Sequence, residues 1–152
     1  MFERIDHVGI AVADLDAALN FYRETFGLVP VHQEDNVEQG VREAMLAVGD
    51  GATQLQLLAP LTPDSAIAAF LDQRGPGVQQ LAYTVADIDA AAAELRAKGL
   101  QVLWPQARRG TAGSRVNFVH PRDAGGVLVE LVEHPAPEPA RRSERPPTDR
   151  IG

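Results

Sequence analysis

Two kinds of hydrophobic pattern alternate along the chain. Short apolar runs are typical of buried strands, and stretches with an apolar residue every three or four positions are typical of amphipathic helices. These patterns predict helices over residues 14–26, about 65–73 and 87–98. Strands are expected at residues 7–12, 28–31, 41–48, 53–58, 81–85, 102–104, 115–119 and 127–132. The predicted order is therefore β-α-β-β-β, a linker helix, and β-α-β-β-β again.

The ends of the two long helices carry matching signals. Asp14 and Asp87 stand where a helix begins, and their carboxylates can accept hydrogen bonds from the first free backbone N–H groups. Gly27 and Gly99 stand where each helix pattern ends. The two halves of the chain therefore begin and end their helices in the same way.

The similarity between the halves extends to the residues themselves. Val12-Ala-Asp-Leu-Asp-Ala-Ala18 aligns with Val85-Ala-Asp-Ile-Asp-Ala-Ala91, 73 positions further on. A repeat of this length indicates a duplicated module. One helix and four strands cannot cover their own apolar face, so two modules are expected to face each other. We predict an α+β fold of two paired βαβββ modules (about 4–60 and 77–134, with a linker at about 62–75) and a cleft between their sheets.

Polar residues inside the predicted strands fall at repeat-related positions. His7 aligns with Gln80, and Gln56 aligns with Glu130. Twofold symmetry would bring all four to one axis, where an imidazole and three oxygen donors would suit a borderline-to-hard divalent ion. The alternative is that each is an isolated polar residue on the solvent face of a strand.

Composition narrows the classes of function. The 152 residues carry a net charge of −7, which argues against a general nucleic-acid surface. The chain has no cysteine, and therefore no disulfide or thiolate site. No secretory signal or membrane-length apolar stretch is visible, so a cytoplasmic location is expected. Residues 136–152 hold four prolines and four arginines, and we expect a disordered tail there after a folded unit over 1–135.

Several segments give the chain a family resemblance that covers residues 4–134. It resembles the vicinal oxygen chelate superfamily (the glyoxalase, bleomycin resistance and dioxygenase proteins) and, within it, the methylmalonyl-CoA epimerase family. The segments are Ile5-Asp-His-Val-Gly-Ile-Ala11, Glu38-Gln-Gly-Val-Arg-Glu-Ala-Met45, Gln54-Leu-Gln-Leu-Leu-Ala-Pro60, Arg109-Gly-Thr-Ala-Gly-Ser-Arg-Val-Asn-Phe-Val-His-Pro121 and Gly126-Val-Leu-Val-Glu-Leu131.

This resemblance implies an epimerase that interconverts (R)- and (S)-methylmalonyl-CoA by removing and returning the C2 proton. It implies Glu43 and Glu130 as the two bases. It also implies that a divalent ion (cobalt, zinc, manganese or magnesium) stabilises the enolate. The implied metal ligands are His7, Gln56, Gln80 and Glu130. Gln80 departs from the family, which has histidine there, and an amide oxygen binds zinc or cobalt less strongly than imidazole. Lower affinity and a shift to harder ions are therefore expected.

The remaining expectations concern the substrate and partners. The glycine-rich loop could bind the substrate carboxylate or the CoA moiety through its backbone N–H groups and cations. Its residues are Arg109, Gly110, Thr111, Ala112, Gly113 and Ser114. The expected partners are a small-molecule acyl-CoA and a second copy of the chain, with no nucleic acid and no membrane. Two alternatives stay open: another glyoxalase-type lyase or isomerase, and a non-catalytic protein that binds a small molecule.

Overall fold

One mixed sheet runs through the described chain. The structure is a computed structural model, and it describes residues 1–138. Eight strands are hydrogen-bonded in the order β2-β3-β4-β1-β5-β8-β7-β6. The strands are β1 (Phe2–Ala11), β2 (Pro30–Asn36), β3 (Val41–Ala47), β4 (Gln54–Pro60), β5 (Gly77–Val85), β6 (Arg108–Arg109), β7 (Arg115–Val119) and β8 (Val129–Glu133). The helices are α1 (Leu15–Phe26), α2 (Ala66–Arg74) and α3 (Ile88–Ala97).

The pairing of strands follows a twofold pattern. In each half the first strand runs parallel to the fourth, β1 beside β4 and β5 beside β8. The two halves meet where β1 pairs antiparallel with β5, with His7 opposite Ala82 and Gly9 opposite Gln80. The prediction of a cleft between two sheets is therefore wrong in one respect. The backbone hydrogen bonds between β1 and β5 join both modules into a single sheet.

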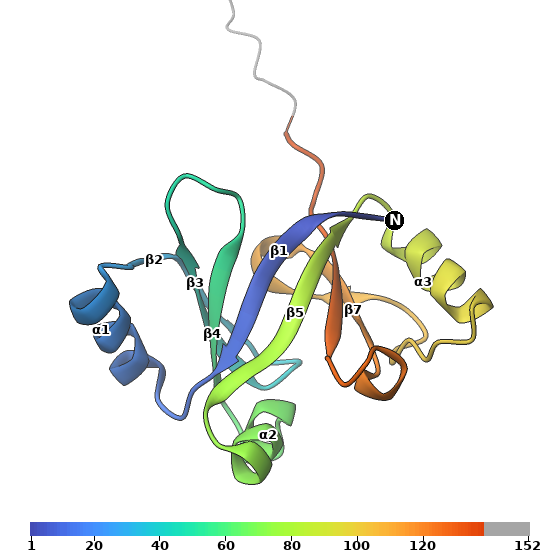
Figure 1. Ribbon diagram of the computed structural model, residues 1–152. Coiled ribbons are helices and arrows are strands. Elements are labelled where there is room, and N and C mark those ends of the chain that lie inside the picture. The colour runs from blue at the N-terminus through green and yellow to red at the C-terminus, as the bar shows by residue number, and fades with distance from the viewer. Residues whose placement is uncertain (139–152) are drawn as a thin grey trace, which may run out of the picture.

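The helices α1 and α3 cover the outer face of this sheet on either side (Figure 1). Both begin as predicted, because Asp14 and Asp87 each accept a hydrogen bond from a backbone N–H in the first turn. Leu15 and Leu19 of α1 pack against β3 and β4, and α3 packs against β7 and β8. Each module thus has its own apolar core outside the sheet.

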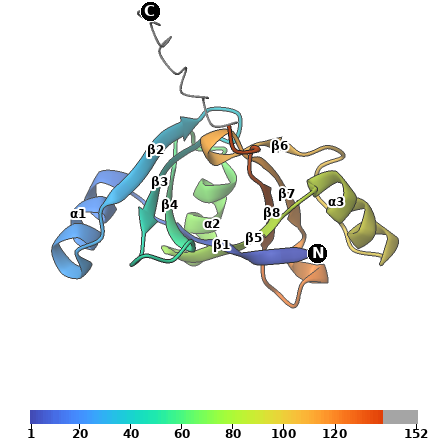
Figure 2. The ribbon, with the colours of Figure 1, turned by 90° about the horizontal axis from the view of Figure 1, so that it is seen from above.

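The inner face of the sheet is not covered by α1 or α3. Seen from above, the sheet curls so that β3 and β4 face β7 and β8 across a space, with β1 and β5 between the two walls (Figure 2). Helix α2 lies at one end of this space, where Ile67 packs against Ala11, Val41 and Leu58. The curled sheet and α2 therefore enclose a cavity on its inner side.

One predicted strand does not form. Residues 102–104 make only an isolated bridge, between Val102 and Val119. The backbone N–H and C=O of Trp104 are bonded instead by the side chain of Asn117, at 3.1 and 3.0 Å. The short edge strand forms four residues later, at β6. The strand prediction here was wrong because a side chain satisfies the backbone in place of a ladder.

Two further expectations concern the ends of the chain and the membrane. The predicted tail begins at residue 136, and residues 139–152 lie outside the described part of the chain. The end of the folded unit at residue 135 stays a prediction. Within residues 1–138, no helix is long and apolar enough to cross a membrane.

Candidate active site

The four repeat-related polar side chains meet on the inner face of the sheet. They come from the four central strands: His7 from β1, Gln56 from β4, Gln80 from β5 and Glu130 from β8. Each is at most 5% exposed. Polar groups buried this deeply need hydrogen-bond partners. The alternative of isolated solvent-facing residues is therefore wrong, and the structure brings the four together as the repeat predicts.

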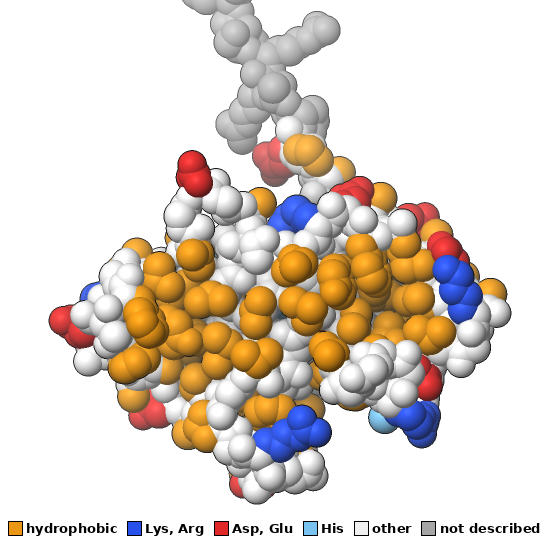
Figure 3. Space-filling view, viewed as in Figure 1, with side chains coloured by type: hydrophobic (Ala, Val, Ile, Leu, Met, Phe, Trp, Pro, Cys, Tyr) orange, Lys and Arg blue, Asp and Glu red, His pale blue; other side chains and the backbone are white. Residues whose placement is uncertain are grey.

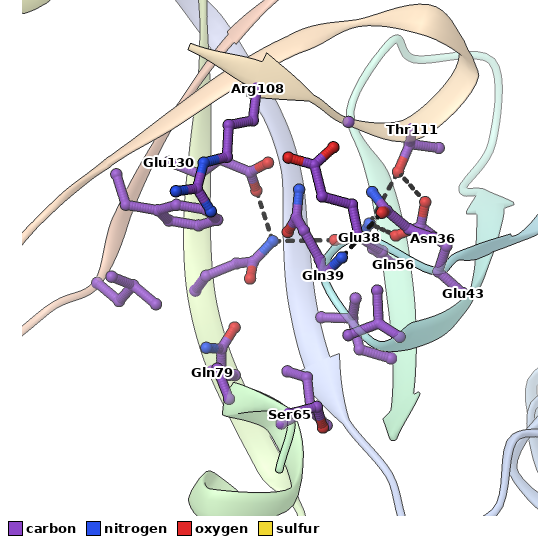
Figure 4. Close-up of a pocket in the computed structure, with 18 of the residues that line it drawn as sticks. Asn36, Glu38, Gln39, Glu43, Gln56, Ser65, Gln79, Arg108, Thr111 and Glu130 are labelled. Carbon is purple, nitrogen blue, oxygen red and sulfur yellow. Dashed lines mark hydrogen bonds between the residues drawn. The ribbon is translucent and has the colours of Figure 1, made fainter. Parts of the chain in front are cut away.

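A chain of hydrogen bonds links two glutamates through the two amides (Figure 4). Gln56 Nε2 donates to Glu43 Oε2 at 2.8 Å, and Gln80 Nε2 donates to Gln56 Oε1 at 2.9 Å. Gln80 Nε2 also donates to Glu130 Oε2, at 2.5 Å. Glu43 and Glu130 therefore lie at the two ends of the chain, with both amides between them.

Gly9 makes room for this arrangement. It lies on β1 opposite Gln80 of β5. A Cβ atom at Gly9 would lie 2.5 Å from Gln80 Cγ, closer than side chains approach. The Gln80 side chain therefore crosses the backbone of β1, and only glycine leaves space for it.

Asp6 fixes the orientation of His7. The Nδ1–H group of His7 donates to Asp6 Oδ1 at 2.7 Å, which leaves Nε2 facing the cluster. Asp6 Oδ2 accepts from Thr84 at 2.8 Å and also bonds His134. Burial opposes ionisation of Asp6, but the hydrogen bonds that it accepts outweigh this and hold its pKa well below the usual range. An ionised Asp6 therefore holds the imidazole in place.

The imidazole is in turn surrounded by negative charge. His7 Nε2 lies 3.0 Å from Glu130 Oε2. Burial lowers the pKa of His7, but the charges of Glu130 and Asp6 and the hydrogen bonds to both outweigh that effect and raise it to about 10. His7 is therefore protonated at neutral pH and neutralises part of the carboxylate charge.

Glu43 stands apart from this charged group and has a different environment. Thr111 Oγ1 donates to Glu43 Oε1, so both carboxylate oxygens of Glu43 accept a hydrogen bond. Burial raises the pKa of Glu43 to about 7; the bond from Thr111 lowers it, and the nearby carboxylates of Glu34 and Glu130 raise it. A carboxyl group whose pKa lies near neutral pH is suited to exchange protons with a substrate.

Both glutamates open into one cavity. Its volume is about 350 Å³, within the range of pockets that hold small molecules. Glu43, Gln56, Gln80 and Glu130 line it on the sheet side. The apolar residues that line it are Val41, Leu58, Ala66, Ile67, Leu103, Trp104, Phe118 and Leu128. The cavity thus combines two carboxyl groups with an apolar wall.

The glycine-rich loop reaches this cavity only in part. Gly110 and Thr111 line the cavity. Arg109 faces elsewhere, because its guanidinium lies 3.5 Å from Glu34 Oε2. The N–H of Ala112 donates to Glu34 as well, at 2.8 Å. Gly113 and Ser114 complete the turn, with Gly110 N donating to Ser114 O at 2.9 Å.

Two residues that contact or line the site were not singled out from the sequence. Asp6 stands directly before His7, and this adjacency could have indicated an orienting carboxylate. Arg108 lines the cavity where Arg109 was expected. Two adjacent arginines carry no signal that tells which one faces inward until the pairing of β6 with β7 is known.

Possible metal-ligand atoms of three side chains converge on the Gln80 amide group. Glu130 Oε2, Gln56 Oε1 and His7 Nε2 lie 2.5, 2.9 and 3.3 Å from a single point, the Gln80 amide nitrogen. Among residues 1–138, no group of three or more His, Cys, Asp and Glu side chains could hold a metal. A cation held by these side chains would therefore need the amide oxygens of the two glutamines as ligands beside His7 and Glu130, which favours harder ions over zinc.

Sequence comparison places this fold and site in a family. The family model of the glyoxalase/bleomycin resistance protein/dioxygenase superfamily matches residues 6–118. The chain belongs to this superfamily. Its α+β fold of two paired βαβββ modules is thereby confirmed.

Three similar proteins narrow the resemblance to one kind of enzyme. A methylmalonyl-CoA epimerase structure from Mycobacterium tuberculosis is 58% identical, with a TM-score of 0.85 and coverage of 90% of both chains. A variant of the Streptomyces coelicolor methylmalonyl-CoA epimerase, in complex with 2-nitronate-propionyl-CoA, is 51% identical, with a TM-score of 0.87 over 90% of this chain and 100% of that one. An ethylmalonyl-CoA/methylmalonyl-CoA epimerase from Cereibacter sphaeroides is 38% identical over 86% of this chain and 98% of its own length. The resemblance to epimerases is confirmed.

Replacing Asp6 by asparagine tests the support of His7. Because the substitution removes one partner of a buried charge pair, Asp6→Asn should lower the free energy of unfolding by about 3 kcal/mol at pH 7. The pKa of Asp6 is lowered in the folded state, so its contribution is present above the unfolded pKa. The deficit should shrink below about pH 4, where the unfolded chain takes up the proton. Denaturant unfolding at pH 7 and below about pH 4 measures the difference in free energy of unfolding between the variant and the wild type. The control is Asp50→Asn, in an exposed turn, which should change the free energy of unfolding very little. An effect of Asp6→Asn as small as that of the control would contradict the role of Asp6.

Proposed function

We propose that this chain is a methylmalonyl-CoA epimerase that inverts C2 of its substrate with two glutamate bases. The observation that carries this proposal is the placement of Glu43 and Glu130. Both are buried, both line one cavity, and they lie at opposite ends of the Gln56–Gln80 amide pair. Inversion at carbon requires a proton acceptor on one face and a proton donor on the other, which is what two separated carboxyl groups supply.

The two carboxyl groups have different environments and would exchange protons with opposite faces of C2. In one direction the ionised glutamate removes the C2 proton and the protonated one returns a proton to the opposite face. The raised pKa of Glu43 lets it hold a proton near neutral pH. Glu130 lies at the other end of the amide pair, with its Oε2 atom 3.0 Å from His7 Nε2. Thr111 and Gln56 fix the Glu43 carboxyl group, so its oxygens face the cavity in one orientation.

A divalent cation is proposed at His7, Gln56, Gln80 and Glu130. Bound there, its positive charge would stabilise the negative charge that develops on the thioester oxygen. Asp6 orients His7 for this role through the Nδ1–H bond. The amide ligands favour manganese or magnesium over zinc or cobalt.

Three further expectations are carried forward as proposals. The substrate is an acyl-CoA, and the protein acts in the cytoplasm. The protein is proposed to be a homodimer, since apolar side chains gather over the outer face of β1 and β5 between α1 and α3 (Figure 3). Among them Phe2 and Ile5 of β1 are 44% and 42% exposed. Exposed apolar surface of this kind is typical of protein interfaces.

Glu43→Gln tests the two-base assignment. The amide keeps the shape but accepts no proton, so epimerisation should fall about 10²–10⁴-fold. In deuterated water, wild-type protein should introduce deuterium at C2 of methylmalonyl-CoA, and mass spectrometry measures this incorporation. Glu38→Gln, which lines the same cavity outside the hydrogen-bonded chain, is the matched control and should stay near the wild-type rate. A wild-type rate in Glu43→Gln would show that the assignment is wrong.

The pH profile of kcat/KM should follow the proton shared by the two glutamates. Inversion needs one proton on the pair in either direction. Because the pKa of Glu43 is raised to about 7, the pair keeps that proton below this pH and loses it above. Epimerisation should therefore fall as the pH rises through 7. Initial rates measured by a coupled assay below and above this pH test the expected fall. A rate that rises with pH instead would contradict the assignment of a shared proton to the two glutamates.

Gln80→His tests the metal ligands without using activity. Imidazole binds zinc and cobalt more strongly than an amide oxygen, so the variant should gain about tenfold or more in affinity for them. Isothermal titration calorimetry of chelator-stripped protein measures this. Gln79→His is the matched control, because Gln79 lines the cavity but lies outside the hydrogen-bonded chain. An equal gain in both variants, or in neither, would remove Gln80 from the ligand set.

A further inference from the structure

Among the described residues, one cationic side chain lines the cavity. Among the described residues that line it, Arg108 is the only lysine or arginine. Four carboxylates line the same cavity: Glu38, Glu43, Asp64 and Glu130. A negatively charged substrate group would be repelled by each of them that is ionised, so Arg108 is the one side chain in the described lining with a charge that attracts it.

The guanidinium of Arg108 is held in position by an aromatic platform. Its Cζ atom lies 4.4 Å from the centroid of the Trp104 ring, a cation–π contact. Trp104 packs edge to face with Phe118, with centroids 5.2 Å apart. Asn117 binds the backbone N–H and C=O of Trp104, and β6 pairs with β7 beside it. The platform is therefore fixed, and little freedom is lost when Arg108 binds a ligand.

The donors of Arg108 remain free. Within residues 1–138, no side chain or backbone oxygen accepts a hydrogen bond from its guanidinium, and no carboxylate forms an ion pair with it. Its neighbour differs in both respects, because Arg109 pairs with Glu34 at 3.5 Å and does not line the cavity. Figure 4 shows the Arg108 side chain reaching into the cavity near Glu130.

We propose that Arg108 binds the free carboxylate that the substrate carries on C2, and that it selects acyl thioesters with such a carboxylate over those without one. This inference rests on the proposed function and names a residue that determines its specificity. The planar fork of a guanidinium matches a carboxylate with two parallel hydrogen bonds. With the carboxylate held at Arg108 beside Glu130 and the CoA end bound, rotation about the bond between C2 and the thioester carbonyl carbon is restricted. The C2–H bond is then presented to the two glutamates.

Two thioesters that differ only in this group make the test. Malonyl-CoA carries the carboxylate and acetyl-CoA lacks it, and neither has a stereocentre to epimerise. Arg108→Met should weaken malonyl-CoA binding by about tenfold to a hundredfold, the usual worth of a charge-assisted hydrogen-bonded pair. Acetyl-CoA binding should be almost unchanged. Isothermal titration calorimetry on the full chain measures both. Arg108→Lys, which keeps the charge without the fork, should fall between wild type and Arg108→Met.

Arg109→Met is the matched control, one residue away and paired with Glu34 outside the cavity. It should leave the affinity ratio of the two thioesters unchanged. An equal loss of both thioesters in Arg108→Met would assign Arg108 to the CoA phosphates, and no loss of either would leave it without a ligand; both results overturn the proposal. The thermal midpoint of each variant is measured alongside. Because Arg108 lies in an exposed two-residue strand, these variants are expected to fold.

Failure of this inference can be distinguished from failure of the proposed function. Wild-type protein that exchanges the C2 proton of methylmalonyl-CoA, together with a variant that still distinguishes malonyl-CoA from acetyl-CoA, would reject only the role of Arg108. Wild-type protein without exchange would reject the epimerase itself.

Discussion

The antiparallel pairing of β1 with β5 is the constraint on which the rest of the structure depends. It joins two small sheets into one, so neither module has an exposed edge at the centre of the molecule. It also sets His7 and Gln80 on neighbouring strands, with Gln56 and Glu130 on the strands outside them. A shift of one residue in this pairing would turn His7 or Gln80 to the opposite face of the sheet. The register therefore determines the fold and the site together.

Within that frame, the buried carboxylates determine how each polar side chain is arranged. Asp6 and Glu130 flank protonated His7, and the N–H donors of Gln80 lie against Glu130. The imidazolium and the amide N–H group both stabilise the negative charge of Glu130. Glu43 has only neutral donors, from Thr111 and Gln56, and its pKa is raised as a result of its burial. Two glutamates in one cavity thus have neighbours of different charge.

The loop between α3 and β7 supplies the side of the cavity opposite the sheet. Trp104, Arg108 and Thr111 come from this loop and from β6, and each lines the cavity. The corresponding part of the first module is a regular strand, β2, with a different composition. The two modules share the central strands that carry the buried cluster. They differ at the edges, where the cavity meets the substrate.

The sequence by itself determined the duplicated βαβββ order, the capped helices and the equivalence of His7 with Gln80 and of Gln56 with Glu130. These features follow from local periodicity and from an internal repeat, and both can be seen in the amino-acid sequence. Only the tertiary structure decided that the two modules share one sheet, that Asn117 replaces a strand at Trp104, and that Arg108 rather than Arg109 faces the cavity. Each of these depends on contacts between residues distant in sequence or on the direction of an edge strand. Neither kind of contact leaves a periodic signal in the residues themselves.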